Sequence, residues 1–240
     1  MQRQDFSHQF DILLNSFNTA ESFPENPPQS DIRLNEYEKS IFLTKAQESY
    51  VESLYTGKNP YGESFEQTEE LRRYLAPLVL EANLTPISTS NGLPLGVDSK
   101  SKFFTLPENT WFITYESVKI SDGNCDNMTT QDVFPVRQDE YHKLKKNPFR
   151  GANNRRALRL DLSGGVVEIV SKFTVTQYYI RYMRKLKPIV LTNLGNDASI
   201  EGYSTPQDCE VHEALHQKIL EMAVRMALQS KANIVNENKY

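Results

Sequence analysis

Apolar residues recur every three or four positions in several stretches of the chain, which is the spacing of an amphipathic helix. The clearest stretch is 35–57, with apolar residues at positions 37, 41, 42, 46, 50, 51, 54 and 55. Asn35 can cap the first free N–H groups, and Glu38, three residues later, completes a capping box. Gly57 can adopt the left-handed conformation that ends a helix. The sequence therefore predicts a helix here with both ends defined.

Three further helices are expected from the same periodicity. Two of them cover 5–17 and 65–76, the second ending before Pro77. The third is expected to begin at Thr205, because threonine is a good N-cap and the following Pro206 suits the first helical position. Its apolar stripe would consist of Val211, Leu215, Ile219, Met222 and Met226.

Between these helices, from about 84 to 192, the pattern changes to short runs of β-branched and aromatic residues separated by turns. Ser121–Asn124 and Ser163–Gly165 are typical turn sequences, and the second predicts a β-hairpin. No helix of crossover length lies between the expected strands, which favours antiparallel pairing. We therefore predict an α+β fold, with N-terminal helices and a long C-terminal helix flanking a mainly antiparallel β insertion.

This pattern divides the chain of 240 residues into three consecutive parts. We expect a helical part at 1–83, a β-rich part with a basic loop at 84–204, and a helix with its tail at 205–240. The last part should pack on the first, giving one composite domain plus an insertion. No run of about 18 apolar residues is present, so no membrane-spanning helix and no membrane partner are expected. The polar N-terminus does not resemble a signal peptide.

The charge distribution is strongly uneven, although the net charge is only −4. Residues 1–80 contain 7 basic and 13 acidic side chains, whereas residues 141–187 contain 12 basic and 2 acidic ones. Such a basic block can contact phosphates of a polyanion, dock on an acidic neighbour such as residues 1–80 of another copy, or simply be a solvated loop. The candidate contact residues are Lys143, Lys145, Lys146, Arg150, Arg155, Arg156 and Arg159.

His212 to His216 match the HExxH pattern, in which two histidines one helical turn apart bind zinc and the glutamate acts as general base. A zinc site needs a third ligand, and the positions of the extended motif are occupied by Ile219 and Met222. Leu215 also belongs to the apolar stripe of the expected helix. An ordinary amphipathic helix is therefore favoured, with a zinc peptidase using His212 and His216 kept as an alternative.

The stretch 34–48 reads LNEYEKSIFLTKAQE and resembles a segment of virion proteins from crAss-like and related Bacteroidetes phages. Later stretches resemble head-to-tail connector proteins of such phages. They are 139–142 with 147–150, then 182–191, 199–202 and the 212–227 helix. This resemblance implies a structural virion protein, not an enzyme, that is made in the bacterial host cytoplasm and forms a ring below the portal. It also implies about twelve copies, contact with the portal and other neck and tail rings, contact with double-stranded DNA, and no cofactor.

In such a ring, polar positions on the 35–57 helix become candidate subunit contacts. They are Glu38, Lys39, Lys45, Glu48 and Glu52. Glu48 and Glu52 are like charges one turn apart, so we expect a basic partner near them. A small DNA-binding accessory protein, acting as monomer or dimer, stays open as a further alternative.

Overall fold

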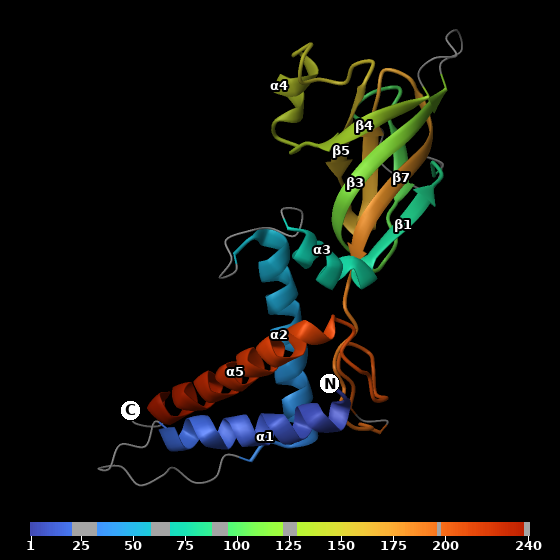
Figure 1. Ribbon diagram of the computed structural model, residues 1–240. Helices are drawn as coiled ribbons and strands as arrows, with labels where there is room; N and C mark the ends of the chain where they lie inside the picture. Colours follow the sequence, from blue (N-terminus) through green and yellow to red (C-terminus); the bar gives the residue numbers. More distant parts are fainter. Residues whose placement is uncertain (21–32, 59–67, 88–95, 122–128, 196–197, 238–240) are drawn as a thin grey trace. The chain divides into compact units, whose positions relative to one another are not determined.

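The computed structural model describes residues 1–20, 33–58, 68–87, 96–121, 129–195 and 198–237 (Figure 1). They form two compact units. Unit 1 combines Met1–Leu78 with Leu186–Tyr240, and unit 2 is Val79–Lys185. Most of the helical structure belongs to unit 1 and the whole sheet belongs to unit 2, which confirms the predicted α+β class.

Among its described residues, unit 1 contains four α-helices, which are α1 (Arg3–Ala20), α2 (Glu36–Thr56), α3 (Glu69–Leu75) and α5 (His216–Glu237). It also contains short 3-10 helices at Ala76–Leu78 and Glu213–Leu215. Helix α5 packs on both α1 and α2 (Figure 1). The interior contains side chains from all four helices. Fully or almost fully buried examples are Phe6, Phe10, Leu43, Leu54, Leu75 and Ile219. Burying these apolar side chains is the main favourable contribution to the stability of the unit.

Both predicted ends of α2 are confirmed. Asn35 Oδ1 accepts a hydrogen bond of 2.8 Å from Glu38 N, and Asn35 N donates one of 2.9 Å to Glu38 Oε2. This is the reciprocal capping box. At the other end, Gly57 has a φ of 76°, in the left-handed region. The expected start of the 65–76 helix lies partly outside the described residues, and α3 itself is capped by Thr68.

The prediction of a helix beginning at Thr205 is wrong, because α5 begins only at His216 after a short 3-10 turn. Gln207 instead forms an isolated β-bridge with Val190, with N–O distances of 3.0 and 3.1 Å in the two directions. The neighbouring backbone at Ile189 and Leu191 is bonded in turn to Thr44 and Ser40 of α2. These long-range hydrogen bonds require an extended backbone, so they override the local preference of the Thr205–Pro206 pair.

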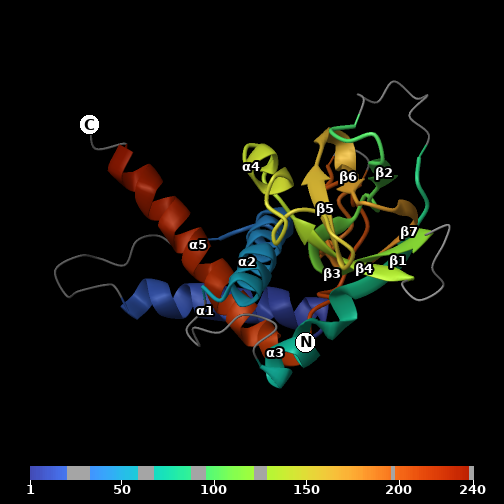
Figure 2. The same ribbon diagram turned by 90° about the horizontal axis from the view of Figure 1, so that it is seen from above.

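Unit 2 is a seven-stranded sheet with the order β1-β7-β3-β4-β5-β6-β2 (Figure 2). Its strands are β1 (Val79–Leu84), β2 (Lys102–Thr105), β3 (Thr110–Ser121), β4 (Thr130–Pro135), β5 (Arg156–Asp161), β6 (Val166–Val170) and β7 (Thr174–Arg184). Every pairing is antiparallel except that of β4 with β5. The mainly antiparallel sheet predicted from the sequence is therefore confirmed.

The tight turn between β5 and β6 is the predicted hairpin at Ser163–Gly165, and both of its glycines have a φ of 70°. Positive φ is what glycine tolerates and other residues avoid. The turn predicted at Ser121–Asn124 falls largely outside the described residues. A buried cluster including Phe104, Val118, Tyr178 and Ile180 forms the core of the sheet.

Candidate functional site

The basic block is centred on a connection between β4 and β5, which we call the basic loop and define as residues 141–156. It begins with the short helix α4 (Tyr141–Lys145), whose Tyr141 is 3% exposed and anchors the loop on the sheet unit. Asn147 Oδ1 then accepts hydrogen bonds from the N–H groups of Phe149 and Arg150, at 2.9 and 3.2 Å. Asparagine favours such turns because its side chain imitates a backbone acceptor.

Gly151 makes the close turn of this loop possible. A Cβ atom at this position would lie 2.8 Å from the carbonyl oxygens of both Asn147 and Leu144, which is too close for any side chain. A few residues later, Asn153 Oδ1 accepts hydrogen bonds from the N–H groups of Arg155 and Arg156. The loop therefore has a defined conformation set by two asparagines and one glycine.

Five of the seven predicted contact residues are exposed: Lys145, described below, and the four residues Lys143, Lys146, Arg150 and Arg155. Within the described ranges, the charged groups of these four side chains form no ion pair. They are therefore free to attract an anionic surface, and this attraction should weaken with salt.

Two other predicted residues are partly used inside unit 2. Lys145 Nζ lies 3.0 Å from Asp98 Oδ2, and this hydrogen-bonded contact lowers the pKa of the Asp98 carboxyl. The guanidinium of Arg156 lies 4.1 Å from the ring centroid of Phe134, a cation–π arrangement. These two side chains help to hold the base of the loop.

The seventh, Arg159, was expected at the contact surface, but its side chain is only 11% exposed. Its Nη1 lies 2.8 Å from Glu116 Oε1, and Glu116 Oε2 also accepts a hydrogen bond of 2.6 Å from the hydroxyl of Tyr178. Burial raises the pKa of Glu116, while Arg159 and Tyr178 oppose that rise. Arg159 thus neutralises a buried carboxylate in the sheet, because strand β5 directs it towards β3.

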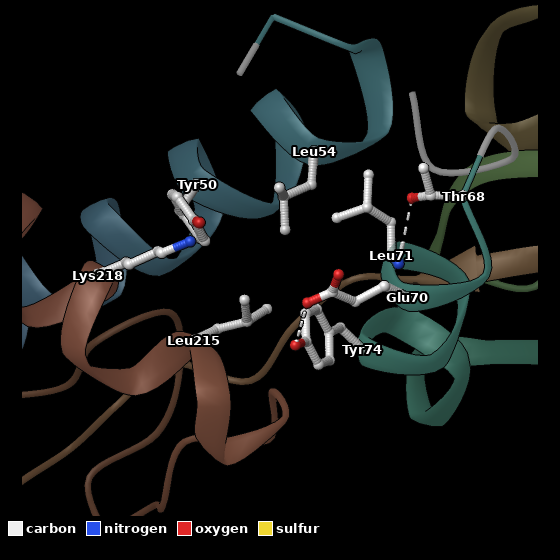
Figure 3. A pocket seen from close by; sticks show the side chains of 8 residues that line it. All are labelled: Tyr50, Leu54, Thr68, Glu70, Leu71, Tyr74, Leu215 and Lys218. Carbon is white, nitrogen blue, oxygen red and sulfur yellow. Dashed lines mark hydrogen bonds between the residues drawn. The ribbon is translucent and has the colours of Figure 1, made fainter. Parts of the chain in front are cut away.

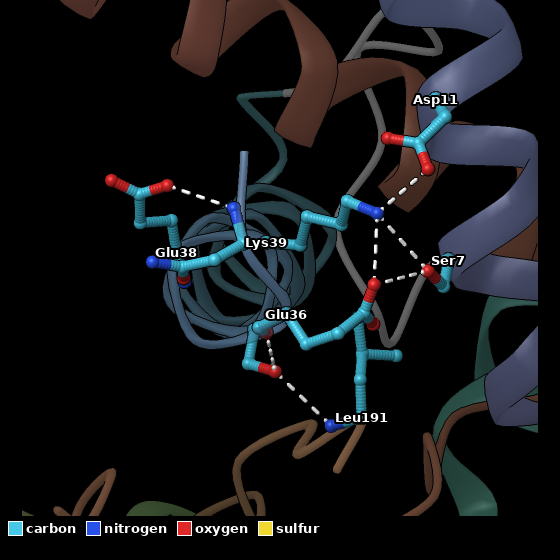
Figure 4. Close-up of polar contacts among 8 residues, drawn as sticks. Ser7, Asp11, Glu36, Glu38, Lys39 and Leu191 are labelled. Atoms are coloured by element: carbon cyan, nitrogen blue, oxygen red, sulfur yellow. Dashed lines mark hydrogen bonds and ion pairs between the residues drawn. The ribbon is translucent and has the colours of Figure 1, made fainter. Parts of the chain in front are cut away.

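Lys39 also differs from its predicted role as a surface contact, since its side chain is 4% exposed (Figure 4). Its Nζ lies 2.7 Å from Asp11 Oδ2, 2.9 Å from Glu36 Oε1 and 3.1 Å from Ser7 Oγ. Burial alone would lower the pKa of Lys39, but the two carboxylates raise it above its usual value. Lys39 therefore joins α2 to α1 within one chain.

The other candidate positions on α2 are more accessible. Lys45 and Glu52 are exposed, Glu48 is half-buried, and Glu38 belongs to the capping box. The basic partner expected near Glu48 and Glu52 stays a prediction.

The HExxH residues do not share one helix face. His212 has a φ of −57° and a ψ of 140°, outside the helical region, and α5 begins at His216. His216 Nε2 lies 2.9 Å from the carbonyl oxygen of Val211, and His212 Nδ1 accepts a hydrogen bond from Ala214 N. Among the described residues, no group of three or more histidines, cysteines, aspartates or glutamates is placed to hold a metal ion. The zinc interpretation therefore has no geometric basis in this part of the chain.

Two features were not predicted from the sequence. The first is Phe149, whose side chain is 85% exposed in the middle of the basic loop. The only sequence signal for it is an aromatic residue between a proline and an arginine in an otherwise polar stretch.

The second feature is a cavity of about 120 Å³ in unit 1 (Figure 3). It is lined by Tyr50, Leu54, Thr68, Glu70, Leu71, Tyr74, Leu215 and Lys218. These residues come from α2, from α3 and its N-cap Thr68, and from α5 and the 3-10 turn before it, so no local pattern could indicate the cavity.

None of the helices that the structure describes is long and apolar enough to cross a membrane. The family described as phage tail ring protein 3/4 matches residues 1–239, and the chain belongs to this family of crAss-like phage ring proteins.

Two relatives from Bacteroides phage crAss001 are similar over almost their full lengths. One, named Ring protein 3, is 41% identical over 242 residues, which cover 100% of both chains. The other, named Ring protein 4/5, is 29% identical over 236 residues, covering 95% of this chain and 92% of the relative.

Proposed function

We propose that copies of this chain form a closed ring in the head-to-tail connector, below the portal, and that the ring supports tail attachment and the retention and passage of DNA. The observation that supports this best is the full-length similarity to a protein named as a ring protein. A ring of about twelve copies, stacked between the portal and other ring proteins, would need no catalytic residue. The subunit would be made in the host cytoplasm and incorporated into the virion.

Ring closure requires a head-to-tail contact, in which one surface of a copy meets a different surface of the next. The charge distribution supports such a contact. The basic loop in unit 2 presents four exposed cations without partners among the described residues, whereas residues 1–80, nearly all in unit 1, have a net charge of −6. We propose that the basic loop of one copy faces unit 1 of its neighbour, with Lys45, Glu48 and Glu52 of α2 among the contacts. Opposite potentials of this kind speed encounter and fix register.

Replacing Lys143, Lys146, Arg150 and Arg155 together by glutamine tests this proposal. We expect assembly into rings, measured by native mass spectrometry at low salt, to require a higher protein concentration than for the wild type. The matched control replaces four exposed basic residues elsewhere and has the same net charge; they are Lys58, Lys119, Lys172 and Arg225. Rings and virions that are unaffected by the first variant, or equally affected by both, would contradict a specific role of the loop.

The same exposed cations also support a second candidate function, non-specific binding of DNA by a monomer or dimer. A DNA shift assay at two salt concentrations separates the two functions. Phosphate contacts made by four cations should weaken steeply with salt. Steeply salt-dependent DNA binding by a protein that never exceeds the mass of a dimer would favour the second function.

A further inference from the structure

Phe149 is the most exposed large apolar residue in the described part of the chain. Its side chain is 85% exposed, compared with 66% for Ile12, the next in order. Exposing an aromatic ring to water is unfavourable, and aromatic side chains with such exposure are frequent anchors of protein interfaces. The ring stands between Pro148 and Arg150, in a loop whose other exposed side chains, apart from Pro148, are polar or charged.

The backbone around this ring is held in place before any partner binds. Phe149 N donates to Asn147 Oδ1 at 2.9 Å, and the carbonyl oxygen of Phe149 accepts a hydrogen bond from Arg156 Nη1 at 3.4 Å. Gly151 N donates to the carbonyl oxygen of Asn147 at 2.8 Å, which closes the turn beneath the ring. A preorganised anchor loses little conformational entropy on binding, so such an arrangement favours association.

The cavity of unit 1 has the size and lining that a phenyl ring needs. Its volume of about 120 Å³ is close to that of apolar protein cavities of about 150 Å³ that bind benzene. Leu54, Leu71 and Leu215 line it on three sides, and the rings of Tyr50 and Tyr74 add aromatic surface (Figure 3).

The rim of the cavity contains a carboxylate that could meet a cation. Glu70 is exposed, and its Oε1 accepts a hydrogen bond from the hydroxyl of Tyr74. Glu69, next to it, is paired with Arg73 at 3.3 Å, and Lys218 lies near Tyr50 (Figure 3). Among the described residues, Glu70 is therefore the acid on this rim that is not paired with a cation. Arg150, which follows Phe149 in the sequence, supplies a cation next to the anchor.

We propose that Phe149 of one copy inserts into the cavity lined by Leu54, Leu71 and Leu215 on the next copy, with Arg150 beside Glu70. This contact is head-to-tail, because the anchor lies in unit 2 and the cavity in unit 1. Repetition of such a contact generates a ring when the rotation closes. The inference rests on the proposed ring and adds the residues that join its subunits.

Phe149→Ala and Phe149→Leu test the anchor. Full burial of a phenylalanine changes an equilibrium by roughly tenfold to a hundredfold. We expect Phe149→Ala to raise the concentration needed for assembly by about that factor, measured by sedimentation velocity, and Phe149→Leu to raise it much less. At concentrations at which the wild type is not assembled, the thermal transition of both variants should equal that of the wild type, because the side chain is exposed in the single copy. Unchanged assembly by Phe149→Ala would overturn the inference.

A photocrosslinker locates the partner surface directly. Copies with p-benzoylphenylalanine at position 149 are mixed in heavy-isotope and normal forms, allowed to assemble, and irradiated. We expect links between different copies, to peptides containing Leu54, Leu71 or Leu215. Links to any other surface, or only within one copy, would overturn the inference.

Charge reversal tests the second half of the contact. Arg150→Glu should weaken assembly, and adding Glu70→Arg to the same chain should restore it, because each interface then pairs the reversed charges. If the double variant assembles no better than Arg150→Glu alone, these two residues do not meet.

These experiments also separate the inference from the function on which it rests. Wild-type protein that never associates with itself and gives no link between copies would refute the proposed ring. Wild-type rings that tolerate Phe149→Ala, or that link position 149 to another surface, would refute only the Phe149 contact.

Discussion

The contact between Arg159 and Glu116 allows a quantitative prediction about unit 2. The two side chains are 11% and 9% exposed, and their nearest nitrogen and oxygen are 2.8 Å apart. Arg159→Met removes the cation and leaves the carboxylate buried, with only the hydroxyl of Tyr178 as a known donor. Removing one partner of a buried ion pair costs about 3–5 kcal/mol. At pH 8 we expect the loss of unfolding free energy to lie at the lower end of this range, because about a tenth of the Arg159 side chain is exposed to water.

The cost should depend on pH in a defined direction. Burial already raises the folded-state pKa of Glu116, and removing Arg159 should raise it further, because Arg159 opposes that rise. Below the ordinary value of 4.5, Glu116 is protonated in both the folded and the unfolded state, so the penalty should be small. As the pH rises through the folded-state pKa, the unfolded chain gains relative stability and the penalty grows.

Urea unfolding at several pH values between 5 and 8 measures this penalty. The single tryptophan, Trp111, lies in β3 and reports on unit 2 by fluorescence. Adding Glu116→Gln to Arg159→Met removes the uncompensated charge and should recover most of the loss at pH 8. A penalty below about 1 kcal/mol at pH 8, or one that does not change with pH, would refute the reasoning.

Three further predictions concern unit 1. Asn35→Ala removes the side-chain acceptor of the α2 capping box and should lower the free energy of unfolding by about 1 kcal/mol, while Asn35→Asp should lose much less. Lys39→Met should cost about 1–2 kcal/mol in the same assay, because hydrogen bonds to Asp11 and Glu36 are lost and both acids are partly exposed. Burial lowers the pKa of His216, so the contribution of this residue to stability is present above pH 6.5 and is lost as the pH falls through the lowered pKa. The unfolding free energy of His216→Gln should therefore change less between pH 7 and pH 5 than that of the wild type.

Local signals in the sequence were reliable where the structure depends on neighbouring residues. The caps of α2 and the glycine turn between β5 and β6 are set within three or four positions, and both were predicted. The start of α5 was not, because the extended conformation at Gln207 depends on Val190, a residue in another segment. Thr205 followed by Pro206 favours the start of a helix in an isolated chain. In the folded protein, the β-bridge between Gln207 and Val190 outweighs this local preference.

The same distinction explains the site residues. The sequence located the basic loop and its charge, but it could not separate the exposed Arg155 from the largely buried Arg159. Burial of a charge depends on a partner, and the partner of Arg159 lies 43 residues away at Glu116, as the partner of Lys39 lies 28 residues away at Asp11. The cavity of unit 1 needs three helices at once, so only the folded chain reveals it.

The division of the chain has a consequence for the order of synthesis. Unit 2 is continuous, and its last strand ends at Arg184, so its sheet can form while the ribosome is still translating the rest. Unit 1 must wait for α5, which packs on α1 and α2. The apolar faces of the first two helices therefore stay uncovered until translation has passed α5. In the ring that we propose, a nascent subunit would display its basic loop before its cavity is complete, and this delay would restrict ring formation to chains that already contain α5.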